Sequence, residues 1–239
     1  MKLHLHEKPQ GVTLVLGFPG FGLVGTIATK FLLEHLDVRK IGEIESNKLL
    51  PLAAIHKDEL IGPLDLFYNK KYNIVILQTL SELSGSEWQI GEVMESLAKS
   101  LKAKEVIILE GLPSNKSKTA MQTYFYSRNN SKMAKGLGLT PIQEGIMMGV
   151  AAAVMLKLEN IPTSIILAES PSKFPDSEAA ARAIKTLDQY LKIDIDYKPL
   201  MKSAQNFEAM LKEMMQKSKE QQIGGNQKRV INSDIDYIG

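Results

Sequence analysis

The chain has 239 residues, of which 44% are hydrophobic and 23% are charged, with a formal net charge of +2 and no cysteine. This balance is typical of a globular protein with one sizeable domain or two small ones. The lack of cysteine excludes disulfides, thiolate catalysis and cysteine-ligated metals. The small net charge gives no reason to expect nucleic acid or an anionic membrane as a partner.

The N-terminal residues lack the long apolar stretch and cleavage site of a signal peptide, so we expect a cytoplasmic protein. The most apolar later segment, 146–158, contains a lysine and is too short to span a bilayer. We therefore expect a protein that does not contact membranes.

Short apolar runs rich in β-branched residues alternate with helical patterns along most of the chain. The runs predict strands at 12–16, 40–45, 72–79, 105–110, 123–126 and 164–168, and the helical patterns lie at 23–36, 86–101, 145–158 and 177–191. We expect Gly111-Leu112-Pro113 to end the strand at 105–110 and Ser86 to cap the helix at 86–101. The less periodic stretch 49–68 is expected to form a hairpin. The alternation predicts an α/β fold in three layers, with a mostly parallel sheet and helices on both faces.

The composition changes after about Asp196, which predicts three parts: an α/β domain at 1–196, a C-terminal amphipathic helix at 197–223 and a flexible tail at 224–239. A heptad seam runs along the helix, formed by Leu200, Ala204, Phe207, Leu211 and Met214. The seam fits packing on its own domain and pairing between subunits equally well. Pairing between subunits would make these five residues an oligomerisation site.

The segment 17–25, Gly-Phe-Pro-Gly-Phe-Gly-Leu-Val-Gly, contains the spacing G-x-G-x-x-G between a predicted strand and a predicted helix. This is the arrangement of a dinucleotide-binding turn, in which backbone N–H groups approach a pyrophosphate. The insertion of Phe18-Pro19, the bulk of Phe21 and the lack of a basic residue argue against a phosphate site. We favour a structural turn, formed by Gly17, Pro19, Gly20, Gly22 and Gly25, and keep a nucleotide- or nucleoside-binding enzyme as the alternative.

This nine-residue unit resembles the N-terminal signature of the proteasome assembly chaperone 2 family. Further segments resemble that family in the same order, at 107–113, 145–149, 161–169 and 175–176. The resemblance covers roughly residues 10–195 and is closest to the archaeal members. It implies a fold like that of nucleoside phosphorylases, no catalysis and no cofactor. It also implies a homo-oligomer whose partners are proteasome α-ring subunits or another assembly factor.

Candidate catalytic groups are few. The four histidines, at 4, 6, 35 and 56, do not form a metal-binding pattern, although His4 and His6 alternate on a possible strand. Glu45, Glu110 and Glu169 each close a predicted strand, and three carboxylates at one sheet edge could serve a phosphorylase-like catalyst. Without a basic partner beside them, we favour hydrogen bonding to loop amides and expect no enzyme.

Proteins that dock on the proteasome α-ring often end in a hydrophobic-tyrosine-any motif, and the resemblance draws attention to the last residues of this chain. Here Tyr237 is antepenultimate, and Asp236 precedes it where an apolar residue is expected. An aromatic and two isoleucines in so polar a tail nevertheless favour partner binding. The predicted partner-binding residues are Ile235, Tyr237, Ile238 and Gly239.

Overall fold

The structure is a computed structural model that describes residues 1–49, 51–56, 59–129 and 139–200. Its strands are β1 (Lys2–Leu5), β2 (Thr13–Gly17), β3 (Arg39–Glu45), β4 (Ala54–His56), β5 (Glu59–Ile61), β6 (Leu64–Asn69), β7 (Ile74–Thr79), β8 (Glu105–Pro113), β9 (Thr123–Arg128), β10 (Thr140–Pro141) and β11 (Thr163–Ser170). Its helices are α1 (Val24–His35), α2 (Glu87–Ser100), α4 (Gly149–Lys157) and α5 (Ser177–Leu191), with short 3-10 turns η1 (Phe21–Leu23) and η2 (Lys118–Ala120).

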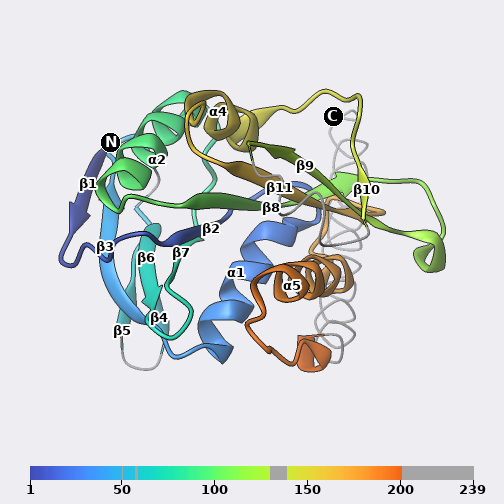
Figure 1. Ribbon diagram of the computed structural model, residues 1–239, viewed down its shortest axis with the longest axis horizontal. Helices are drawn as coiled ribbons and strands as arrows, with labels where there is room; N and C mark the ends of the chain where they lie inside the picture. Colours follow the sequence, from blue (N-terminus) through green and yellow to red (C-terminus); the bar gives the residue numbers. More distant parts are fainter. Residues whose placement is uncertain (50, 57–58, 130–138, 201–239) are drawn as a thin grey trace, which may run out of the picture.

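One nine-stranded sheet, in the order β1-β3-β6-β7-β2-β8-β11-β9-β10, forms the centre of the molecule (Figure 1). Four adjacent strands, β7, β2, β8 and β11, run parallel to one another. Antiparallel pairs flank them, as β6 with β7 on one side and β9 with β11 on the other. The predicted α/β fold is confirmed, with the parallel pairing concentrated where both faces of the sheet are covered.

Helices cover both faces of the sheet and so form the outer layers (Figure 1). Alternate residues of each central strand point to opposite faces, as in β8, where Val106 and Ile108 join one core cluster and Ile107 and Leu109 join the other. Side chains of α2 and α4, such as Met94 and Val154, belong to the first cluster. The second includes α1 and α5.

Most predicted boundaries match the structure to within two residues, and two differ by more. Helix α5 covers 177–191 as predicted, and Asp176 caps it by accepting a hydrogen bond from the Ala179 N–H at 2.9 Å. Strand β8 does not end before Gly111 but continues to Pro113, because β11 offers a parallel partner along that whole stretch. Helix α4 begins at Gly149 and not at residue 145, and Gly149 itself has a positive φ of +75°.

The weakly periodic stretch contains the β4–β5 hairpin, as expected, and also β6, which joins the main sheet. Ser86 precedes α2, but its side chain makes no capping hydrogen bond. Within the described part of the chain, no helix combines the length and apolar character needed to cross a membrane.

Candidate functional site

The glycine turn lies where β2 passes through η1 into α1, at the carboxyl end of the parallel strands. Gly17 and Gly25 pack directly on each other, so that a Cβ on either would overlap the other's backbone. A Cβ at Gly25 would also overlap the carbonyl oxygen of Leu109 on β8. The two glycines therefore let α1 approach the sheet at backbone contact distance.

Protein groups occupy the rest of the turn. Gly22 has a φ of +65°, and its carbonyl oxygen accepts a hydrogen bond from the Asp176 N–H at 2.9 Å. A Cβ on Gly22 would lie 2.7 Å from Ser170 Oγ, which itself donates to Asp176 Oδ2 at 2.7 Å. Phe18 is only 1% exposed and belongs to the core. The turn thus links α1 to the start of α5.

Glu110 is the ionisable group closest to this turn. Its carboxylate accepts hydrogen bonds from the N–H groups of Gly111, at 3.2 Å, and Phe21, and it lies where a side chain on Gly20 would be. Burial raises the pKa of Glu110 to about 7, against the opposing effect of the two N–H donors. Desolvation therefore dominates, and the carboxyl group is close to half-protonated at neutral pH.

The three strand-closing carboxylates do not converge. Glu45 lies near the β1 edge of the sheet and pairs with His4 at 3.2 Å, while β6, β7 and β2 separate its strand from β8. Glu169, on the strand next to Glu110, pairs with Lys116 at 2.8 Å and accepts from the Gln122 N–H at 2.8 Å. Burial opposes its ionisation, but these contacts hold the pKa of Glu169 below its usual value. Glu110 and Glu169 accept from backbone N–H groups, as the hydrogen-bonding interpretation expects. Glu45 and Glu169 also have the basic partners, His4 and Lys116, that the sequence analysis did not expect.

Among the described residues, no group of three or more histidine and acidic side chains has the geometry to hold a metal ion. His35 lies at the end of α1, where its ring is stacked on Phe31 and its Nδ1 donates to the Phe31 carbonyl oxygen at 2.9 Å.

An apolar groove of about 740 Å³ lies between α1, the strands β3, β6 and β7, and the β4–β5 hairpin. Leu33 and Phe67 contribute to its apolar lining, and the hairpin beside it exposes Ile55 and Leu60 by 80% and 67%. Exposed apolar groups clustered in this way are a feature of interaction surfaces. The sequence analysis missed the groove, since the hairpin has no strong pattern and only the fold brings it beside α1.

The predicted seam and tail are mostly beyond the described residues. Leu200, the first seam residue, is 7% exposed and packs in the core cluster of α1 and α5. The other seam residues, Ala204, Phe207, Leu211 and Met214, and the tail residues Ile235, Tyr237, Ile238 and Gly239 lie outside the described part of the chain.

Comparison with known proteins agrees with this fold. The model of the PAC2 family matches residues 14–215. An uncharacterised protein of Methanocaldococcus jannaschii is 25% identical over 208 residues, which is 84% of each chain. The crystal structure of Pyrococcus furiosus PbaA, an archaeal homologue of proteasome-assembly chaperone, has a TM-score of 0.81 at 24% identity and covers 92% of this chain and 99% of its own.

A second Pyrococcus furiosus structure is also similar. PbaB, an archaeal proteasome activator, has a TM-score of 0.74 at 20% identity, with 90% of this chain and 98% of that chain covered. At these identities the two structures establish the common fold, and the family model establishes the relationship that the sequence motifs predicted.

Proposed function

Because the chain belongs to the PAC2 family, we propose that it is a proteasome assembly chaperone-like protein that binds other proteins and catalyses no reaction. Its partners would be proteasome core-particle subunits, such as those of the α-ring, or another assembly factor. The observation that carries this proposal is the family match, which covers residues 14–215 and so extends from β2 to beyond Leu200. The likeness to PbaA and PbaB supports the same class of role.

The proposed working form is a cytoplasmic homo-oligomer that displays several C-terminal segments. The α/β domain at 1–196 would serve as the scaffold, the helix at 197–223 would pair subunits, and the tail at 224–239 would contact the partner. Several tails on one particle would raise a weak single-tail affinity by avidity, provided that their spacing matches the partner.

The geometry of the glycine turn argues against the alternative, a nucleotide- or nucleoside-binding enzyme. Phe18 belongs to the core at the site where a phosphate would approach, and the Asp176 side chain beside the turn already accepts hydrogen bonds from Ser170 Oγ and the Ala179 N–H. Glu110, the carboxyl group beside the turn, already accepts hydrogen bonds from the N–H groups of Phe21 in the turn and Gly111 on β8. Calorimetric titration with NAD, ATP and nucleosides should therefore give no heat of binding, and micromolar affinity for any of them would favour the enzyme.

The test of the chaperone proposal is capture of a partner. The tagged chain, incubated with native extract and with purified α-ring subunits in parallel, should retain α-ring subunits or an assembly factor, identified by mass spectrometry. A reversed arrangement with the α-ring subunits immobilised controls for adhesion to the resin. Recovery of neither class of protein in both arrangements would contradict the proposal.

A further inference from the structure

A second concave site lies between α5 and the strands β9 and β10, at the edge of the sheet opposite β1. It has a volume of about 390 Å³, and the charged residues that line it are Arg182 and Lys185, with no acidic residue among the lining side chains. We infer that this pocket binds a small phosphate-bearing molecule. The inference goes beyond the proposed chaperone role, which does not require a small ligand.

Arg182 carries a positive charge that no carboxylate compensates within the described residues. Its Nη2 donates to the carbonyl oxygen of Glu169 and lies 3.9 Å from the sulfur of Met121. Its Nε is buried and has no hydrogen-bond partner in the described structure. This Nε is too deeply buried to reach a ligand in the pocket, but a partly buried guanidinium without a carboxylate partner is costly, and an anion at its accessible part would lower that cost.

The Glu169 carboxylate does not neutralise Arg182. Although Arg182 bonds to the main chain of Glu169, the Glu169 carboxylate is directed to Lys116, at 2.8 Å, and to Ser114, at 3.1 Å. Other cations of the chain have close acidic partners, as Lys40 does with Asp65 at 3.0 Å. The charge of Arg182 is therefore available to a ligand.

Lys185 adds a second cation one helical turn further along α5. Residues 182, 185, 186 and 189 share one face of the helix, while Ala183, Ile184 and Leu187 are buried against the sheet. No ion pair of Lys185 is found within the described residues, and its side chain is exposed at the pocket. Two cations at this spacing can act on one ligand from the same side.

The other lining groups favour phosphate over other anions. Thr123 and Thr140, from β9 and β10, Thr186, from α5, and Gln122 and Gln189 also line the pocket, and their side chains carry neutral hydrogen-bonding groups. Several neutral donors around two cations suit a tetrahedral dianion, and arginine is well suited to phosphate. The lining contains no aromatic residue to stack on a base, and the volume is near the lower limit of small-molecule sites. A small phosphate compound is therefore a better fit than a nucleotide.

Calorimetric titration of the full chain with inorganic phosphate, at ionic strength held constant with chloride, tests the inference. We expect saturable binding at one site per chain, and much weaker binding of acetate, which carries a single charge on a planar group. Thermal unfolding in phosphate and in chloride gives a second readout, since a ligand of the folded state raises the melting temperature. Non-saturable heats, or acetate binding as tight as phosphate binding, would overturn the assignment.

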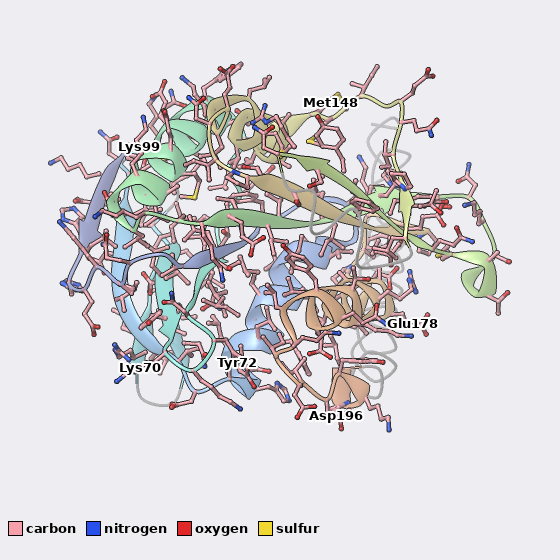
Figure 2. All side chains as sticks on the ribbon, in the orientation of Figure 1. Lys70, Tyr72, Lys99, Met148, Glu178 and Asp196 are labelled. Carbon is pink, nitrogen blue, oxygen red and sulfur yellow. The ribbon has the colours of Figure 1, made fainter. Side chains whose placement is uncertain are left out.

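Variants locate the binding. Arg182→Gln should weaken phosphate binding by about tenfold or more, and Lys185→Gln by about three- to tenfold, as expected for losing charge-assisted contacts. The matched control is Lys99→Gln on α2, which lies far from α5 and pairs with Glu95 (Figure 2). Because phosphate also stabilises folded proteins non-specifically, the decisive quantity is the difference between variant and control.

Arg182→Gln could impair folding, because the Glu169 carbonyl oxygen would lose its donor. Lys185→Gln changes only an exposed side chain and keeps the test valid in that event. If Lys185→Gln binds phosphate as tightly as the Lys99→Gln control, Arg182 only ties α5 to β11 and the inference is wrong.

Discussion

At the scale of single residues, Glu110 combines a buried carboxyl group with two backbone N–H donors at the glycine turn. Its pKa of about 7 in the folded chain exceeds the ordinary value of 4.5, so the folded state holds this proton more tightly than the unfolded state does. The contribution of Glu110 to stability is therefore greatest below pH 4.5, and it is lost as the pH rises towards 7. The difference of pKa corresponds to about 3 kcal/mol at most.

We predict that Glu110→Gln removes this pH dependence while its amide oxygen still accepts from the turn. The free energy of unfolding, measured by urea denaturation between pH 4.5 and 8, should rise for the variant relative to the wild type by about 3 kcal/mol across that range. A constant difference between the two proteins over the range would show that the carboxyl group titrates normally.

Gly22 is the second residue whose role can be tested alone. Gly22→Val should destabilise the fold by about 2 kcal/mol or more, because valine is strained at a φ of +65° and its Cβ would lie 2.7 Å from Ser170 Oγ. The matched control is Gly11→Val, since Gly11 has a φ of +67° but no atom within 4 Å of an added Cβ. Chemical denaturation of both variants separates backbone strain from overlap, and equal losses would show that the packing around Gly22 is unimportant.

At the scale of elements, the first residues of the predicted C-terminal helix pack against the domain core. Leu200 is buried with the side chains of α1 and α5, so the first position of the heptad seam serves the fold of its own chain. Whether the seam packs on its own domain or pairs subunits therefore concerns its later residues, from Ala204 to Met214.

We predict that Phe207→Glu lowers the mass of the oligomer measured by light scattering, because a charge in a subunit interface is costly to bury. The control is Gln205→Glu, which adds the same charge outside the seam. An unchanged mass together with a lower melting temperature would instead place the seam against its own domain. A wild-type chain that is monomeric at micromolar concentration would remove the oligomer from the proposal.

At the scale of the whole molecule, the scaffold and the tail have separable tasks in the proposed function. Truncation after Gln227 should leave the melting temperature and the oligomer mass nearly unchanged, because the removed residues are polar apart from a few side chains. The same truncation should weaken capture of α-ring subunits or assembly factors. Tyr237→Ala should reproduce most of that loss, whereas Asn232→Ala, a tail substitution of a polar residue, should not. Full capture by the truncated chain would move the binding surface to the α/β domain.

The groove and the pocket on the surface of the molecule are hard to predict from the sequence. Met148, before α4, is exposed on one side of the sheet, and Glu178, at the start of α5, lies on the other (Figure 2). The groove beside α1 and the pocket beside α5 both combine segments distant in the chain, as Phe67 with Leu33 and Thr123 with Arg182. Neither combination has a local pattern.

The sequence by itself determined the α/β class, most of the strands and helices, and the family. Buried strands such as β2 and β7 are continuous apolar runs, and α5 has a capping aspartate and a regular apolar face, so each is encoded within its own segment. Such local signals follow directly from the periodicity of strands and helices.

Only the tertiary structure decided which strands are neighbours and hence which side chains meet. The order of the sheet separates Glu45 from Glu110 and directs the Glu169 carboxylate to Lys116, while Arg182 bonds to the Glu169 main chain. It also lets β8 continue through Gly111 to Pro113, against their local preference, because β11 supplies hydrogen bonds there. Pairing, burial and the pKa of Glu110 depend on contacts between residues far apart in the chain, and no local periodicity records those contacts.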